Sequence, residues 1–159
     1  MLRPALLLAV GLPALLLLAP TRAADPEPSP GLAPSEVVRI QLEALQTNDD
    51  PYDDAGIATV FRFASPGNRA ATGPLERFTA MVHGPAYRDM LGFRRALYGA
   101  MRVEGDRAVQ SVTLVHEDGR RVSYVFGLSR QTGGACDGCW MTDAVVREPE
   151  PAEPPSRKV

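Results

Sequence analysis

The sequence predicts an α+β domain, with helices in its first half and an antiparallel sheet in its second half. From Ser35 to Gly84, apolar residues recur at the spacing of helices. Beyond Tyr87, apolar and polar residues tend to alternate, which is typical of half-buried strands. The two patterns are segregated along the chain, and segregation favours an α+β fold over a parallel α/β fold.

Three helices are expected before the sheet. The first starts at Ser35, whose hydroxyl can cap it, and ends at the DDPYDD cluster. The second spans residues 55–63 and stops at SPGN, and the third lies in GPLERFTAMVHG and closes at Gly84. Each helix presents apolar side chains to a core, among them Val38, Leu42, Leu45, Ile57, Val60, Phe61, Leu75, Phe78 and Val82.

About four strands are expected after the helices, joined as a meander that ends in WMTDAVVR. The sequence VEGDRA predicts a tight turn in which Glu104 and Arg107 face each other across two strands. The next connection contains Asp118-Gly119 between two extended runs, which predicts a two-residue turn with positive φ at both positions.

This turn would pair Val115 with Val122 and Thr113 with Tyr124. Apolar side chains then fall on the opposite face as well, for example Leu114. A sheet that is apolar on both faces needs two covers. The helices can supply one, and a partner subunit or the final strand can supply the other, so a homodimer formed through the sheet is expected.

The first 23 residues have the order of a secretory signal peptide. Arg3 precedes an apolar run from Pro4 to Pro20, and small residues flank the expected cleavage site after Ala23. An uncleaved membrane anchor is the alternative, but the run is short for a bilayer span and Pro13 interrupts it. We therefore expect a bacterial protein that is periplasmic or secreted, with no stable membrane anchor after cleavage.

Proline-rich segments frame one folded domain. They contain few large apolar residues and cannot bury enough surface to offset the loss of chain entropy. The expected organisation is a signal peptide at 1–23, a linker at 24–34, a single α+β domain at 35–147 and a disordered tail rich in Pro and Glu at 148–159.

Charge and motifs exclude several classes of partner. The formal net charge is −2, which gives no basic face for nucleic acid. The acidic cluster of residues 49–54 lacks the glycine and the final glutamate of a calcium loop. His83 and His116 occur at no familiar metal spacing and are read as solvated or helix-capping residues. We expect no metal and no cofactor.

The two cysteines, Cys136 and Cys139, lie in GGACDGCWMTD and permit three interpretations. A redox pair would place the first thiol at a helix start, but a strand is expected after Cys139. A zinc site would need two further ligands, for instance from a second subunit. A structural disulfide needs nothing more in an oxidising compartment, and Gly138 lets the short loop close. The disulfide is the preferred interpretation.

Four segments resemble the domain of unknown function 4864 family of small bacterial proteins. They are PSEVVRIQLEALQTND, ASPGNRAATGPLERF, RFTAMVHGPAYRDML and GCWMTDAV, within residues 34–146. The resemblance implies a cystatin-like, nuclear transport factor 2-like architecture, in which a curved sheet wraps around helices as a cone. It implies no activity and no catalytic residues, because fold alone does not decide function.

Candidate site residues lie on the last two strands. If Asp143 faces the core, its carboxylate stands among Tyr124, Phe126 and Trp140 and could serve as an acid or base, with Tyr124 as a second catalytic candidate. Phe126 and Trp140 are candidates for the pocket wall. Alternation along the strand does not decide where Asp143 points, because both faces hold apolar residues.

Two functions are compatible with these features. The preferred one is a non-enzymatic module that binds a small apolar ligand or a protein, since the sequence offers no nucleophile, base and orienting group together. The alternative is a small pocket enzyme, an isomerase, dehydratase or hydrolase, that works through Asp143.

Overall fold

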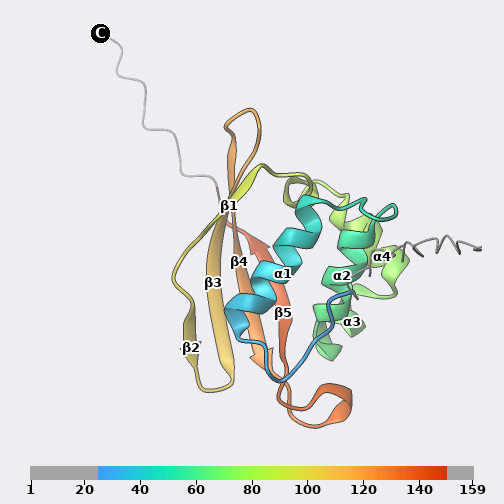
Figure 1. Ribbon diagram of the computed structural model, residues 1–159, viewed down its shortest axis with the longest axis vertical. Helices are drawn as coiled ribbons and strands as arrows, with labels where there is room; N and C mark the ends of the chain where they lie inside the picture. Colours follow the sequence, from blue (N-terminus) through green and yellow to red (C-terminus); the bar gives the residue numbers. More distant parts are fainter. Residues whose placement is uncertain (1–24, 150–159) are drawn as a thin grey trace, which may run out of the picture.

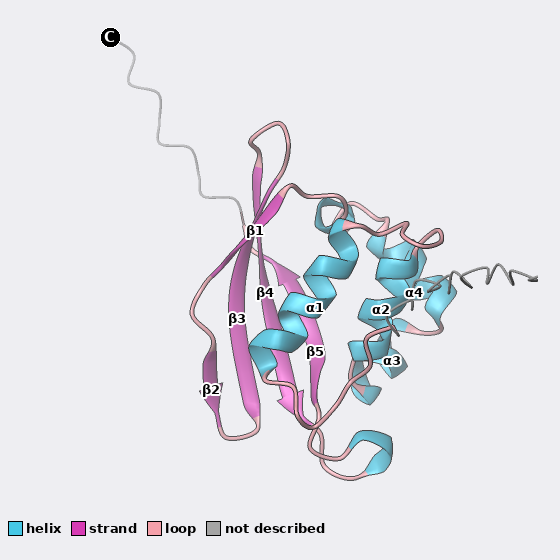
Figure 2. Cartoon of the chain, in the orientation of Figure 1, coloured by secondary structure: helices cyan, strands magenta, loops and turns pink. Residues whose placement is uncertain are grey.

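The computed structural model describes residues 25–149, which form helices packed on one side of an antiparallel sheet (Figure 1). The α-helices precede the five strands in the described chain, and Figure 2 shows these helices beside the sheet, so the α+β prediction is confirmed. The elements in order are α1 (Pro34–Gln46), α2 (Ala55–Phe63), α3 (Pro66–Thr72), α4 (Leu75–Val82), the 3-10 turn η1 (Arg88–Met90), β1 (Arg95–Tyr98), β2 (Arg102–Glu104), β3 (Arg107–Val115), β4 (Arg121–Arg130), the 3-10 turn η2 (Gly134–Cys136) and β5 (Trp140–Arg147).

The described residues contain four α-helices, one more than the sequence predicted. The additional helix is α3, whose sequence PGNRAAT has no large apolar residue and therefore no helical periodicity. Ser65 caps it by accepting a hydrogen bond from the N–H of Asn68 at 3.2 Å, and Pro66 occupies its first position.

Helix α1 begins two residues earlier than expected from a cap at Ser35. Pro34 is its first residue and Ala33 is its N-cap, so Ser35 lies inside the first turn and not at the cap. The carboxylate of Glu36 accepts the N–H of Ala33 at 2.7 Å and satisfies a backbone donor that would otherwise lack a partner.

The sheet has five strands within the described residues, in the order β1-β3-β4-β5, with β2 also paired to β3. Strands β1 and β2 pair with opposite ends of β3, both along the edge of β3 that does not pair with β4. The turn between β2 and β3 matches the prediction, because Glu104 stands opposite Arg107 and Gly105 has a φ of 57°.

The predicted register between β3 and β4 is wrong by one residue. Val122 pairs with Leu114, and Tyr124 pairs with Val112. The connection is longer than a two-residue turn: the N–H of His116 reaches the carbonyl of Arg120 at 2.9 Å. Of the two central residues expected to have positive φ, only Gly119 does, at 82°.

This correction changes the outer face of the sheet, the face away from the helices. A shift of one residue moves every side chain of a strand to the other face. The inner face of β3 and β4 is apolar apart from Gln110, whereas small and polar residues alternate with valines on the outer face: Val109, Ser111, Thr113, Ser123, Val125 and Gly127. The expectation of an apolar layer on both faces followed from the incorrect register.

A β-bulge interrupts the pairing of β4 with β5. Leu128 pairs with Thr142 and Gly127 pairs with Ala144, so Asp143 is the extra residue between them. Such a bulge leaves one residue without a partner and reverses the faces to which the later side chains of the strand point. Thr142 and Val145 consequently lie on the same, inner face although they are three residues apart.

Helices α1 and α2 approach each other closely at Gly56. A side-chain carbon added there would lie 2.9 Å from the Cα of Asn48 and closer still to the backbone of Ala44. Only glycine permits this contact. The close approach lets Ile57 and Phe63 of α2 reach the same fully buried core as Leu42 of α1.

The proline-rich segment before α1 lies against the domain in its described part. Leu32 packs on the core, and Arg62 forms ion pairs with Asp25 at 3.4 Å and Glu27 at 3.5 Å. The predicted signal peptide, its cleavage site and the tail beyond residue 149 lie outside the described residues.

Candidate functional site

A pocket of about 390 Å³ opens between the helices and the free edge of β5. Helices α1 to α4, the residues around η1 and strands β4 and β5 supply its wall. Most of the wall is apolar, with Leu45, Val60, Phe78, Met81, Met90 and Phe126 among its residues. The wall residues with polar side-chain groups are Gln41, Ser65, Asn68, Thr72, Tyr87, Thr142 and Asp143.

The pocket lies between two hydrogen-bonded contacts that cover parts of the β5 edge. At one side of the pocket, the N–H of Ser65 donates to the carbonyl of Thr142 at 2.9 Å, and Ala64 forms a bridge with the same residue. At the other side, the Tyr87 hydroxyl donates to the carbonyl of Val145 at 3.2 Å. The bulged residues between these two contacts form the part of the strand that borders the pocket.

Thr142 connects the pocket to the core through a buried hydrogen-bond pair. Its hydroxyl accepts from Gln41 Nε2 at 2.8 Å and donates to Gln41 Oε1 at 3.1 Å. Gln41 is fully buried and also donates to the carbonyl of Val37 at 3.0 Å. Since the partners are buried, the pair fixes α1 against β5 beneath the pocket.

Asp143 borders the pocket, but its carboxylate engages residues of the outer face. Oδ1 accepts a hydrogen bond from the Ser129 hydroxyl at 2.9 Å, and Oδ2 lies 3.8 Å from Nη1 of Arg107. Ser129 and Arg107 are paired neighbours in β3 and β4. The sequence left open whether Asp143 points inward or outward. The bulge interrupts the alternation of the strand, and Asp143 pairs with Arg107.

The other residues predicted for the site lie in different places. Phe126 is in the pocket wall. Tyr124 is buried and its hydroxyl donates to the carbonyl of Ala86 at 3.1 Å, and burial raises its pKa to about 12. Trp140 is buried in the core at the start of β5 and does not belong to this pocket's wall. The structure thus brings Phe126 and Asp143 to one pocket and holds Tyr124 in a structural hydrogen bond.

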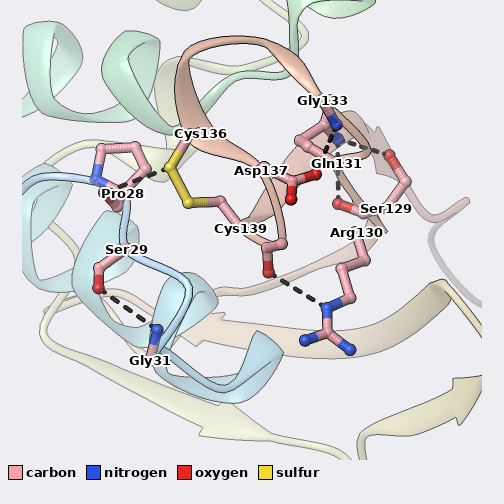
Figure 3. The surroundings of a disulfide bond; sticks show 11 residues. Pro28, Ser29, Gly31, Ser129, Arg130, Gln131, Gly133, Cys136, Asp137 and Cys139 are labelled. Atoms are coloured by element: carbon pink, nitrogen blue, oxygen red, sulfur yellow. Dashed lines mark hydrogen bonds between the residues drawn. A yellow bond between two sulfur atoms is a disulfide. The ribbon is translucent and has the colours of Figure 1, made fainter.

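Cys136 and Cys139 form a disulfide, as predicted, with their Cα atoms 5.5 Å apart. Figure 3 shows this disulfide within the loop that leads into β5, next to the segment before α1, where Cys136 Sγ lies 3.5 Å from the carbonyl of Pro28. Cys136 ends η2 instead of starting a helix, so the geometry of a thioredoxin-type thiol is missing from this loop. The disulfide fixes the start of β5.

Neither histidine belongs to the pocket wall: His116 Nε2 is buried with no hydrogen-bond partner among the described residues, and His83 forms a polar contact elsewhere. His83 Nε2 lies 2.8 Å from Asp54 Oδ1, whose pKa is lowered by the hydrogen bond from Asn48 and by His83, against the effect of burial. Among the described residues, no cluster of three His, Cys, Asp or Glu side chains could hold a metal ion.

Sequence reasoning missed Asn68, Ala71 and Thr142 as residues of the pocket. Asn68 and Ala71 lie on α3, a helix without apolar periodicity, and no local pattern connects them to β5. Thr142 pairs with Gln41, a partner 101 residues away. A buried polar pair of this kind leaves no signal in the spacing of either residue.

Among the comparisons with known proteins, a family model matches this chain. The family described as a domain of unknown function (DUF4864) matches residues 33–153. Neither the curated proteins nor the solved structures contain a significant match to this chain.

Proposed function

We propose a ligand-binding function for this chain, which belongs to the DUF4864 family: it is a non-enzymatic module that takes a small, mainly apolar molecule into the pocket beside β5. The observation that carries this proposal is the pocket itself. Its volume of about 390 Å³ falls within the range of small-molecule sites, and such sites combine an apolar wall with a few placed polar groups.

The polar groups in the wall favour binding over catalysis. Within the described part of the chain, Asp143 is the single charged residue among them, and its carboxylate engages Ser129 and Arg107. Thr142 and Gln41 are occupied with each other. A pocket enzyme that works through Asp143 and Tyr124 has less support, because Tyr124 donates its hydroxyl proton to a backbone carbonyl.

A neutral fluorescent probe, N-phenyl-1-naphthylamine, tests the proposal by titration. We expect its emission to rise on binding and the Ala71→Phe variant to lower its affinity at least about tenfold, since Ala71 is in the wall and a phenyl ring would fill the space. Ala70→Phe is the matched control, because Ala70 is an exposed neighbour on the same helix outside the wall. Equal affinity in both variants, or no probe binding by the unmodified protein, would overturn the proposal.

Export is part of the proposal. The disulfide supports an oxidising compartment, such as the periplasm or the exterior. None of the helices within residues 25–149 has the length and hydrophobicity needed to span a bilayer. N-terminal sequencing of the exported protein tests the predicted cleavage: we expect Ala24 as the first residue, and an intact Met1 would contradict it.

We also propose the cone-like, cystatin-like architecture for the family. Helices gathered on one face of an antiparallel sheet support this architecture (Figure 1).

We further propose a homodimer formed through the sheet. The exposed Leu97, Val109 and Val146 support the dimer. Sedimentation velocity tests the dimer. A monomer at micromolar concentration, unchanged by Val109→Asp, would contradict it.

A further inference from the structure

We propose that the ligand of this pocket carries a neutral hydrogen-bonding head group, an alcohol or an amide, on an apolar body, and that the pocket selects it over an anion of the same length. This inference rests on the proposed function, which it makes more specific. It is carried by a polar corner of the pocket, defined as Ser65, Asn68 and Thr142, and by the charges around it.

The polar corner is fixed by three hydrogen bonds. Asn68 Nδ2 donates to the carbonyl of Thr142 at 3.0 Å, and the N–H of Ser65 donates to the same carbonyl at 2.9 Å. The backbone N–H of Asn68 donates to Ser65 Oγ at 3.2 Å. Because these bonds join the start of α3 to the edge of β5, the corner is preorganised before any ligand enters.

The corner keeps unused hydrogen-bonding capacity. A carboxamide has two N–H donors and one carbonyl acceptor, and a serine hydroxyl has one donor. Among the described residues, Asn68 uses one side-chain N–H, and neither its Oδ1 nor the Ser65 hydroxyl proton has a partner. The corner therefore offers both an acceptor and a donor, which suits a group that donates and accepts, such as an alcohol or a primary amide.

The charges of the wall disfavour an anionic head. Within the described residues, no Lys, Arg or His belongs to the wall, and the single charged residue is the acid Asp143. Moving a carboxylate from water into an apolar site without a cation is costly. The nearby Arg69 lines a separate hollow beside the disulfide loop and not this pocket.

The wall outside the polar corner suits an apolar body. Phe78, Met81 and Met90 belong to it, and Phe78 packs against Phe61 with ring centroids 5.2 Å apart and the rings tilted by 54°. Methionine side chains adapt to irregular shapes, so this side can accept a flexible chain. The geometry separates a head-binding corner from a body-binding wall.

Displacement of N-phenyl-1-naphthylamine by decanol and by decanoate at pH 7 tests the inference. We expect decanol to displace the probe at a concentration at least about tenfold lower than decanoate. The Asn68→Ala variant should weaken decanol more than it weakens the probe, so the ratio of the two affinities falls, whereas Arg69→Ala, on the same helix outside the wall, should change neither affinity.

The outcomes separate the inference from the proposed function. A bound probe that decanoate displaces as well as decanol, or that neither displaces, overturns the neutral head group and leaves the pocket as a binding site. A probe that does not bind overturns both. The comparison of decanol with decanoate on the unmodified protein decides the inference even where Asn68→Ala does not fold.

Discussion

The two halves of β5 differ in how they are held, although they belong to one strand. Trp140, Met141 and Thr142 are buried, at 9%, 4% and 2% exposure, and the disulfide precedes them directly. Beyond the bulge at Asp143, the strand borders the pocket and ends exposed, with Val146 at 59%. One inserted residue thus ends the tightly held half of the strand and lies where the pocket opens.

The largest effect is expected in the tightly held half, from Thr142→Val. Valine keeps the shape but removes the hydroxyl, so both polar groups of the Gln41 carboxamide lose a buried partner. We expect the free energy of unfolding to fall by about 3 kcal/mol. Urea unfolding followed by the fluorescence of Trp140, the single tryptophan, measures it.

Thr113→Val is the matched control for this substitution. Thr113 shares a hydrogen bond of 2.8 Å with Ser123 on the half-buried outer face, where water can replace the lost partner. We expect a loss of less than about 1 kcal/mol there. Equal losses in the two variants would mean that the buried pair does not hold the first half of β5.

The disulfide should contribute less, although it stands at the start of the same half. A disulfide between cysteines three positions apart in the sequence stabilises the folded state by about 2 kcal/mol in the chain-entropy model. The double variant Cys136→Ser/Cys139→Ser should lose that amount in urea unfolding and keep its affinity for the probe, because the cysteines lie outside the pocket wall. Two free thiols in the purified native protein would contradict the disulfide.

The exposed end of β5 is held by a carboxylate whose contribution depends on pH. Asp89 forms two ion pairs, one between Oδ1 and Nη1 of Arg120 and one between Oδ2 and Nη1 of Arg147, each at 2.9 Å. Burial opposes its ionisation, but the hydrogen bond and charge of Arg120 and the charge of Arg147 outweigh burial and lower the pKa of Asp89. The unfolded chain has the ordinary aspartate pKa of about 3.9.

A lowered pKa in the folded state makes this stabilisation complete above about pH 4 and lost as the pH falls through the folded value. We expect Asp89→Asn to cost about 1.5 kcal/mol at pH 7 and to cost progressively less under acid conditions. Thermal unfolding across pH measures both. Asp53→Asn, at an exposed position, is the control. A cost that does not change with pH would contradict the ionised bridge.

The periodic elements of this fold were predictable, and the features that shape the site were not. Apolar spacing located α1, α2, α4 and the hairpin of β3 and β4. The register failed because it depends on the length of one turn, and Asp118-Gly119 is compatible with more than one length. The shape of the pocket depends on a bulge and on α3, neither of which carries an apolar pattern.

Two of the predicted site residues nevertheless lie in the pocket wall. Phe126 is predictable from alternation along β4, a long strand with a regular inner face. Asp143 stands out in the sequence as an acid among apolar residues, but its direction required knowledge of the bulge. Contacts between residues far apart in the chain, such as Asn68 with Thr142, depend on the packed structure and cannot be read from local spacing.

The smallest effect is expected from the side chain of Asp143 itself. Its hydrogen bond to Ser129 is half-exposed and Arg107 is 80% exposed, so Asp143→Ala should cost less than about 1 kcal/mol and leave the probe affinity unchanged. Asp143→Asn is the control, since it keeps an acceptor for Ser129 and removes only the charge. A loss of probe binding in Asp143→Ala that Asp143→Asn does not share would place the carboxylate oxygen at the ligand. Unchanged probe binding in both variants would mean that residue 143 shapes the pocket through its backbone, as the extra residue of the bulge.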